Sequence, residues 1–189
     1  PTGKFYGTDF HSSLYFQEKI DLLQKIVALE GPIHLEVAAR RLIKGWLLER
    51  VTERVSDKVM EIARLCSRKQ IIKIKGDFLY SLDNLIHAEN LATFPVRVPD
   101  DRPEAQREIR FISPEEVQAA ILLVLKYALS LPEELLYSET RKLFGFKRSG
   151  DQIRDRLAGE LKTLIKRQLV VRDGGKIVLA SFLGANNLR

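Results

Sequence analysis

The sequence is poor in the residue types that most catalytic and metal sites require. It contains one cysteine, Cys66, and three histidines, His11, His34 and His87, which lie far apart along the chain. A single cysteine excludes an internal disulfide framework, and neither residue type occurs at the spacing of a zinc site. Cys66 falls on the apolar face of a predicted helix, which favours a buried, unreactive thiol. We therefore expect no metal and no cofactor.

Phosphate-loop and membrane signals are missing as well. The chain has no GxxxxGK[ST] motif, so it lacks the nucleotide-binding loop of an ATPase motor. It has no apolar run long enough to cross a bilayer and no segment that resembles a signal peptide. These features predict a soluble, cytoplasmic protein with no membrane partner and no small-molecule substrate. Because the chain begins at Pro1 rather than at methionine, we also expect a piece of a longer protein.

The acidic residues do not suggest an active site. Glu115-Glu116 and Glu133-Glu134 fall in the first turns of predicted helices, where the helix dipole favours negative charge. No nucleophile with a neighbouring base is evident, so we expect no enzymatic activity from this chain. The chain does carry excess positive charge. Its net charge of +6 favours acidic partners.

The most informative stretch, residues 147–180, predicts one helix followed by a two-stranded hairpin. The helix carries an apolar stripe at helical spacing that includes Leu157. Strands are expected over 169–172 and 176–180. The residues Asp173-Gly174-Gly175 between them tolerate the positive φ angles of a tight turn.

The same pattern occurs 98 residues earlier, over residues 49–80. Arginine, apolar and glycine positions align at this offset: Arg50 with Arg148, Val59 with Leu157, and Gly76 with Gly174. Each copy follows two more helical stretches, of which the second pair matches with a small register gap. The order of three helices and a hairpin is that of a winged helix, whose third helix commonly enters a DNA groove.

The sequence therefore predicts a mainly α fold with small β-hairpins, an α+β protein built of tandem winged-helix repeats. The expected segments are an extended lead-in (1–16), winged-helix unit 1 (17–82), a proline-containing connector (83–112), winged-helix unit 2 (113–182) and a tail (183–189). Within the connector, residues 94–97 and 107–111 are expected to be extended. Thr52 is a predicted N-cap, and Ser113 with Glu116 three residues later is typical of a capping box.

Several short motifs carry a resemblance to a known family. They are the helix ends at Gly45-Trp46 and Gly145-Phe146, RSGDQIRDRL at 148–157, FPVR at 94–97 and ISPEEV at 112–117. Over about residues 17–180 the chain resembles the domain at the C-terminal end of large bacterial superfamily-one helicase-like proteins, which follows the motor and a Vsr-like nuclease domain. The resemblance implies that the parent protein translocates or cleaves nucleic acid. It also implies that the helicase and nuclease domains of the same parent chain are partners, and that this piece supplies no catalytic residues.

Basic residues on the predicted third helices and wings indicate nucleic-acid binding, with DNA expected rather than RNA. Cations on the outer face of a helix can clamp phosphates while the wing contacts the flanking backbone, and such binding weakens steeply with salt. The predicted nucleic-acid-binding residues are Arg54, Lys58, Lys73, Lys75, Lys147, Arg148, Arg154, Arg156, Lys162, Arg172 and Lys176. Further cations on the same helices are Arg64, Arg68, Lys166 and Arg167.

Two other interpretations remain open. Acidic residues such as Asp57 and Asp155 interrupt the basic faces, as they would on an ordinary solvated helix. Alternatively, the chain is a protein-interaction or structural module that packs on the motor or nuclease domains without touching nucleic acid. That function requires an exposed apolar patch, for which the candidates are Leu47-Leu48, Leu135-Leu136-Tyr137 and the aromatic residues within 5–16.

Overall fold

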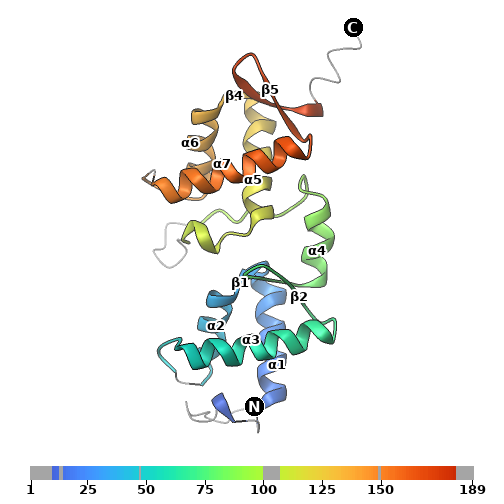
Figure 1. The fold of residues 1–189 in the computed structure, drawn as a ribbon, viewed down its shortest axis with the longest axis vertical. Coiled ribbons are helices and arrows are strands. Elements are labelled where there is room, and N and C mark those ends of the chain that lie inside the picture. Colours follow the sequence, from blue (N-terminus) through green and yellow to red (C-terminus); the bar gives the residue numbers. More distant parts are fainter. Residues whose placement is uncertain (1–9, 13–14, 47, 100–106, 149, 182–189) are drawn as a thin grey trace. The chain divides into compact units, whose positions relative to one another are not determined.

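The structure, a computed structural model, describes residues 10–12, 15–46, 48–99, 107–148 and 150–181. Its contacts divide the chain into two units, Pro1–Ile86 and His87–Arg189 (Figure 1). The predicted tail and most of the predicted lead-in lie outside the described residues. Each unit contains the same succession of elements and is treated by itself below.

Unit 1 combines three helices with a three-stranded antiparallel sheet in which β3 lies between β1 and β2. Its third helix packs against both the first and the second (Figure 1). The core between helices and sheet includes Leu23, Val59 and Leu79, together with Trp46, which is buried as a core residue rather than exposed for stacking. The elements are α1 (Phe16–Glu30), β1 (Ile33–His34), α2 (Leu35–Lys44), α3 (Glu53–Arg68), β2 (Lys73–Lys75) and β3 (Phe78–Tyr80).

Unit 2 repeats this architecture, with the sheet order β4-β6-β5. Its core includes Ile121, Leu136, Leu157 and Ile177, so the predicted phase of the third helix is correct. The elements are a 3₁₀ turn η3 (Ile109–Phe111), α5 (Pro114–Ala128), β4 (Ser130–Pro132), α6 (Glu133–Leu143), α7 (Asp151–Lys166), β5 (Val170–Asp173) and β6 (Lys176–Leu179). A further helix, α4 (Leu82–Glu89), crosses the division between the units.

The predicted fold class is confirmed, because the chain is mainly helical with two small antiparallel sheets. The sheets have three strands each rather than the predicted two. The additional strands, β1 and β4, span only two and three residues and run directly into the following helix. A segment that short shows no alternation of apolar and polar residues, so the sequence pattern does not reveal it.

The repeat extends over the whole unit at a constant offset. α5 begins and ends 98 residues after α1, and α7 begins and ends 98 residues after α3. α6 begins 98 residues after α2 and ends 99 residues after it, so the second helices differ by one residue in length, in agreement with the small register gap expected between them. Gln70 and Gln168, which follow the third helices, have left-handed φ angles of 57° and 56°. The two units therefore repeat a backbone conformation as well as a residue pattern.

The turn of the second wing has the predicted chemistry. Asp173 pairs with Lys176 across the hairpin, which leaves Gly174 and Gly175 as the two turn residues. Their φ angles of 53° and 79° are both positive, as a type I′ turn requires and as side-chain-bearing residues rarely allow.

The predicted N-caps are confirmed, but the capping box is only half correct. The hydroxyl of Thr52 accepts a hydrogen bond from the Val55 amide, and that of Ser113 accepts one from the Glu116 amide, both at 3.3 Å. The Glu116 carboxylate does not return to Ser113. It is buried and pairs with two connector side chains, Arg97 at 2.5 Å and Arg107 at 2.9 Å.

The connector contains more regular structure than predicted. α4 lies where no helix was expected, and η3 replaces the predicted extended segment at 107–111. The only buried residue of α4 is Ala88, while Leu82 and Ile86 are exposed. Because most of its apolar side chains do not face a core, this helix has no clear amphipathic signature in the sequence.

Candidate nucleic-acid interface

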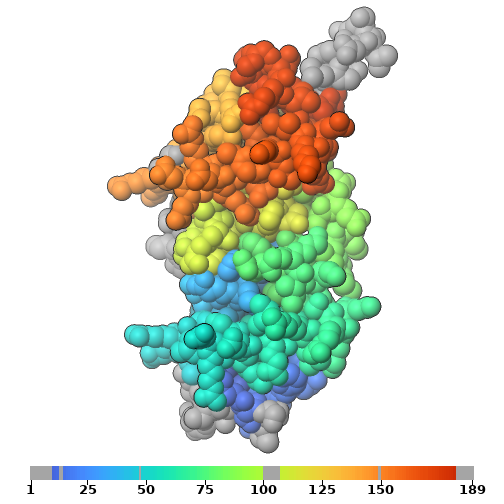
Figure 2. Space-filling model, in the orientation of Figure 1, coloured from blue at the N-terminus to red at the C-terminus, as the bar shows by residue number. Residues whose placement is uncertain are grey.

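The outer face of α3 carries unpaired positive charge toward its C-terminal end. Arg64 and Arg68 are both exposed and lie about one helical turn apart, since residues i and i+4 share a helix face. Neither has an ion-pair partner among the described residues. Figure 2 shows α3, in blue-green, at the surface of unit 1. These guanidinium groups are thus available to an external anion.

The C-terminal half of α7 has the same arrangement. Lys162 and Lys166 lie 98 residues after Arg64 and Arg68, and both are exposed. Within the described part of the chain they too have no ion-pair partner. Arginine and lysine both bind phosphate, although only arginine does so with a planar fork of donors. A cationic pair therefore occupies the same place on the third helix of each unit.

The loop before each third helix adds one more equivalent pair of cations. Arg50 and Arg148 are both exposed, and neither has an ion-pair partner in the described residues. Between this loop and the C-terminal pair, the outer face carries an exposed aspartate, Asp57 in α3 and Asp155 in α7. The positive charge is therefore concentrated at the two ends of each face. Such a surface favours separate phosphates at its ends and repels one at its centre.

About half of the predicted residues remain available for binding. These side chains are exposed and have no ion pair or hydrogen bond to another described residue. They are Arg54, Lys73, Lys147, Arg148, Lys162 and Lys176.

Two predicted residues of unit 1, Lys58 and Lys75, contact other side chains of the same unit. The ammonium group of Lys58 lies 2.9 Å from the Glu61 carboxylate and 5.3 Å from the centre of the Phe16 ring. The ammonium group of Lys75 lies 5.1 Å from the centre of the Tyr80 ring. A cation over an aromatic face is attracted by the ring's quadrupole, so both side chains are partly occupied.

Two predicted arginines of unit 2 are paired with the first turn of α6. Arg172, on the wing, lies 2.5 Å from Glu133, and Arg154, on α7, pairs with Glu134. The Tyr137 hydroxyl donates a hydrogen bond of 2.6 Å to Glu133. That bond and the nearby Arg172 hold the pKa of Glu133 below its usual range, whereas burial raises the pKa of Tyr137. Glu133 is therefore a persistent anion that neutralises Arg172 within the fold.

Arg156 serves the fold rather than a surface. Its guanidinium group donates to the Ile112 carbonyl at 3.2 Å and lies 3.5 Å from Glu160. Glu160 is buried and accepts a hydrogen bond of 2.6 Å from Gln118, which also accepts one from Arg167. This polar network links α5 to α7. Arg156 lies on the flank of α7, where helical periodicity alone does not separate a core contact from solvent.

Arg64, Arg68 and Lys166 were absent from the predicted binding residues although they fell on the predicted outer face. The repeat in the sequence does indicate these residues. Arg64 aligns with Lys162 and Arg68 with Lys166 at the offset of 98, so both copies carry a cation at each of the two positions. A comparison of charge between the two copies would have identified them.

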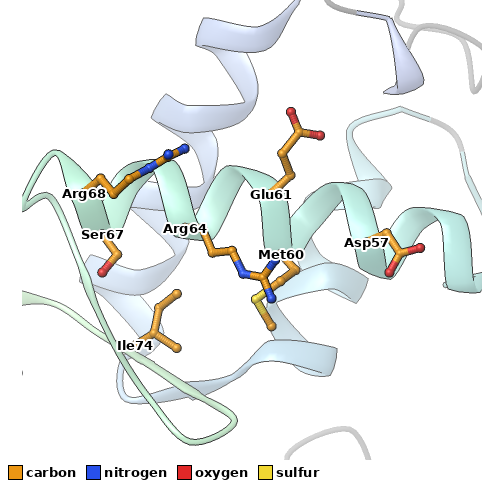
Figure 3. A pocket seen from close by; sticks show the side chains of 7 residues that line it. All are labelled: Asp57, Met60, Glu61, Arg64, Ser67, Arg68 and Ile74. Carbon is orange, nitrogen blue, oxygen red and sulfur yellow. The ribbon is translucent and has the colours of Figure 1, made fainter.

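A groove lies between the outer face of α3 and the edge strand β2 (Figure 3). Its volume is about 790 Å³. It combines apolar, cationic and anionic side chains, namely Asp57, Met60, Glu61, Arg64, Ser67, Arg68 and Ile74. In Figure 3 the Arg64 side chain extends on the same side of α3 as Met60 and Ile74, whereas Glu61 extends toward the opposite side. Arg64 is therefore the cation whose side chain points toward the apolar part of the groove.

Unit 2 has a mainly apolar groove of about 480 Å³. It runs between α5, connector residues and the base of the wing. Its lining includes Leu91, Phe94, Leu122, Leu169 and Leu179, and Lys126 is the one charged side chain among the described residues that line it. In unit 1 the α1 residues equivalent to Ala119, Leu122 and Leu123 are the polar Asp21, Gln24 and Lys25, so this apolar surface is a property of the second unit.

The apolar patches predicted from the sequence are largely covered where the structure describes them. Leu136 and Tyr137 are buried in the core of unit 2, and Phe10 is buried in that of unit 1. Tyr15, Phe16 and Leu48 pack partly buried against the core of unit 1, whereas Phe5, Tyr6 and Leu47 lie outside the described residues. Within Leu135-Leu136-Tyr137 only Leu135 is exposed, because the apolar face of α6 packs against the core.

The described residues offer neither a metal site nor a membrane-spanning helix. No group of three or more His, Cys, Asp and Glu side chains in this part of the chain is placed to hold a metal ion. Cys66 is a free, buried thiol, and burial raises its pKa. Across the described helices, none is both long and apolar enough to span a membrane.

A family model described as "Protein of unknown function (DUF3320)" matches residues 9–57, which contain α1, β1, α2 and the first residues of α3. No curated protein and no solved structure matches the chain. The chain is thus similar to an uncharacterised family over the first half of unit 1.

Proposed function

We propose that both units bind the phosphate backbone of nucleic acid, DNA rather than RNA, through the outer faces of α3 and α7. The observation that carries the proposal is the recurrence of exposed cations. Arg64 and Lys162 occupy equivalent positions, as do Arg68 and Lys166, and none of them has an ion-pair partner in the described residues. Their charge serves no contact in the described fold, so an external anion is the simplest partner.

The charge pattern supports backbone contact without reading of base sequence. In a winged helix the third helix is the element that commonly approaches a DNA groove. Here the cations lie at the ends of that helix face, and Asp57 or Asp155 lies between them. Phosphate contacts position a protein on DNA but carry no sequence information. We therefore propose binding that is independent of sequence and strongly dependent on salt.

The test is fluorescence-anisotropy titration of labelled duplex, forked and single-stranded DNA at low and moderate salt. We expect wild type to bind and the variant R64A/R68A/K162A/K166A to lose about 100-fold in affinity at low salt, since each phosphate contact contributes to counterion release. The control is K25A/K126A, which removes one exposed cation from the first helix of each unit and is matched by R64A/K162A, which removes one from each third helix. Equal losses in these two double variants would show that net charge, not the third helices, governs binding.

In this proposal the chain is a non-catalytic accessory module of a larger, cytoplasmic helicase- or nuclease-like protein. The support is the resemblance of its motifs to the C-terminal domain of such proteins and the chemistry of its exposed residues. The module would hold the nucleic acid while the motor or nuclease domains act on it.

A second candidate function, docking onto the other domains of the parent protein, is favoured by the apolar groove of unit 2. Connector residues such as Phe94 already pack on this face of α5, next to Ala119, so the groove continues an existing apolar contact. Leu122→Glu should prevent co-elution of the chain with the rest of its parent protein in size-exclusion chromatography. Tyr127→Glu, an exposed position on α5 that does not line the groove, is the control. Retained co-elution of the Leu122 variant would contradict docking at this groove.

A further inference from the structure

We propose that the groove between α3 and β2 in unit 1 binds one unpaired nucleobase, so that unit 1 prefers single-stranded nucleic acid. This inference rests on the proposed binding of phosphates by α3 and adds a second contact to the same ligand. It concerns the side of the helix that faces the wing, where Met60 and Ile74 form an apolar surface beside Arg64.

The first step of the argument is the composition of the groove. Met60 and Ile74 are half-buried and line it together, although Met60 comes from the helix and Ile74 from the wing. Phosphates gain nothing from apolar side chains, so a purely electrostatic site would not need them. A nucleobase has an apolar face that is exposed to water once it leaves the helical stack, and burying that face is favourable.

The second step is the position of the cations. Arg64 and Arg68 line the same groove and have no ion-pair partner among the described residues. A guanidinium plane can stack on a base as well as bind a phosphate, and Arg64 lies on the same side of the helix as the apolar residues (Figure 3). A base on Met60 and Ile74 would therefore bring its own backbone phosphate within reach of the arginines. In a duplex, the bases are stacked and paired, and their faces are not accessible.

The third step is the contrast with unit 2. At the equivalent positions, Ala158 replaces Met60 and Arg172 replaces Ile74, while the cations remain as Lys162 and Lys166. Arg172 is moreover held by Glu133. The second unit thus keeps the phosphate-binding residues and lacks the apolar surface, so base binding is assigned to unit 1 alone.

The experiment compares a labelled oligothymidylate, an abasic strand of the same length and a duplex by anisotropy at low salt. Wild type should bind oligothymidylate more tightly than the abasic strand. The variant M60A/I74T should lose about five-fold in affinity for oligothymidylate, which corresponds to a modest apolar contact, and should bind the duplex as wild type does. The variant K162A/K166A, which alters only phosphate contacts in unit 2, should weaken binding to all three ligands.

Equal binding of oligothymidylate and abasic strand by wild type would overturn the base-binding groove and leave phosphate binding intact. Failure of all three ligands to bind would instead refute the proposed function itself. If M60A/I74T lacks a native melting curve, the wild-type protein still gives a decisive result. A strand that contains 4-thiothymidine should become photocrosslinked to the peptide around Met60. Crosslinks only to other peptides would overturn the inference.

Discussion

Glu116 illustrates how a single buried charge is held in this fold. It has no exposed surface, and burial by itself would raise its pKa. Hydrogen bonds from Arg97 and Arg107 outweigh that effect and hold the pKa below the ordinary value. The carboxylate is therefore ionised in the folded protein and joins the connector to the first turn of α5.

We predict that Glu116→Gln lowers the free energy of unfolding of unit 2 by about 2 kcal/mol at neutral pH. Removing one partner of a buried ion pair is costly, but Arg97 and Arg107 are partly exposed and can be rehydrated, which reduces the cost. Urea unfolding followed by circular dichroism measures the change. Glu108→Gln removes a carboxylate from an exposed ion pair with Arg110, so it should change stability by less than about 0.5 kcal/mol.

The pH dependence gives an independent check on Glu116. Because folding lowers the pKa of Glu116, its contribution is fully present above the pKa of the unfolded chain and is lost as pH falls through the pKa of the folded protein. The stability difference between wild type and Glu116→Gln should therefore shrink as pH falls below the ordinary glutamate value of 4.5. A difference that stays constant down to the acid unfolding transition would mean that the carboxylate is not ionised in the fold.

At the scale of elements, the sequence predicted those features that leave a periodic or local chemical signal. The helices with an apolar stripe, the caps at Thr52 and Ser113 and the two-glycine turn at Gly174 are all of this kind. β1 and β4 were missed because two or three residues show no period, and α4 was missed because it buries little. The two short strands form because β3 and β6 supply their hydrogen-bond partners.

The candidate interface was less predictable than the fold because the sequence does not show which cations form ion pairs within the fold. Arg154 and Lys162 look alike in the sequence, yet Arg154 pairs with Glu134 and Lys162 has no ion-pair partner in the described region. Arg156 was assigned to a binding surface but bonds to the Ile112 carbonyl, 44 residues away in sequence. Such long-range partners are set by packing between helices, which one sequence does not show.

The first turn of α6 should act as an internal competitor for nucleic acid. Glu133 and Glu134 hold Arg172 and Arg154, which would otherwise add two cations next to the α7 face. We predict that E133Q/E134Q binds duplex DNA about five-fold more tightly at low salt, because both arginines become available to phosphate. Anisotropy titration measures the change.

The matched control for this prediction is E108Q/E139Q, which also removes two negative charges from surface ion pairs. The Glu108–Arg110 pair lies at the start of η3 and the Glu139–Lys142 pair lies on α6, and neither pair includes Arg154 or Arg172. If the control variant gains as much affinity as E133Q/E134Q, the effect reflects net charge, and competition by α6 is wrong.

For the whole molecule, duplication has a consequence that a single winged helix lacks. Two weak sites on one chain reach higher affinity together when both contact the same ligand, because the second contact is made at high effective concentration. The equivalent cations of α3 and α7 would then contribute to one binding event. If each unit instead bound its own ligand, the affinities would remain separate.

Salt dependence distinguishes these two cases. We predict that R64A/R68A and K162A/K166A each reduce the slope of log affinity against log salt for duplex DNA by about two, and that the combined variant reduces it by about four. Each single-unit variant should also lose about 10-fold or more in affinity, since removing one site abolishes the joint contact. Titration calorimetry should give one duplex per chain for wild type. A stoichiometry of two duplexes per chain, with the slope of the remaining site unchanged in each single-unit variant, would show that the units bind independently and would refute joint binding.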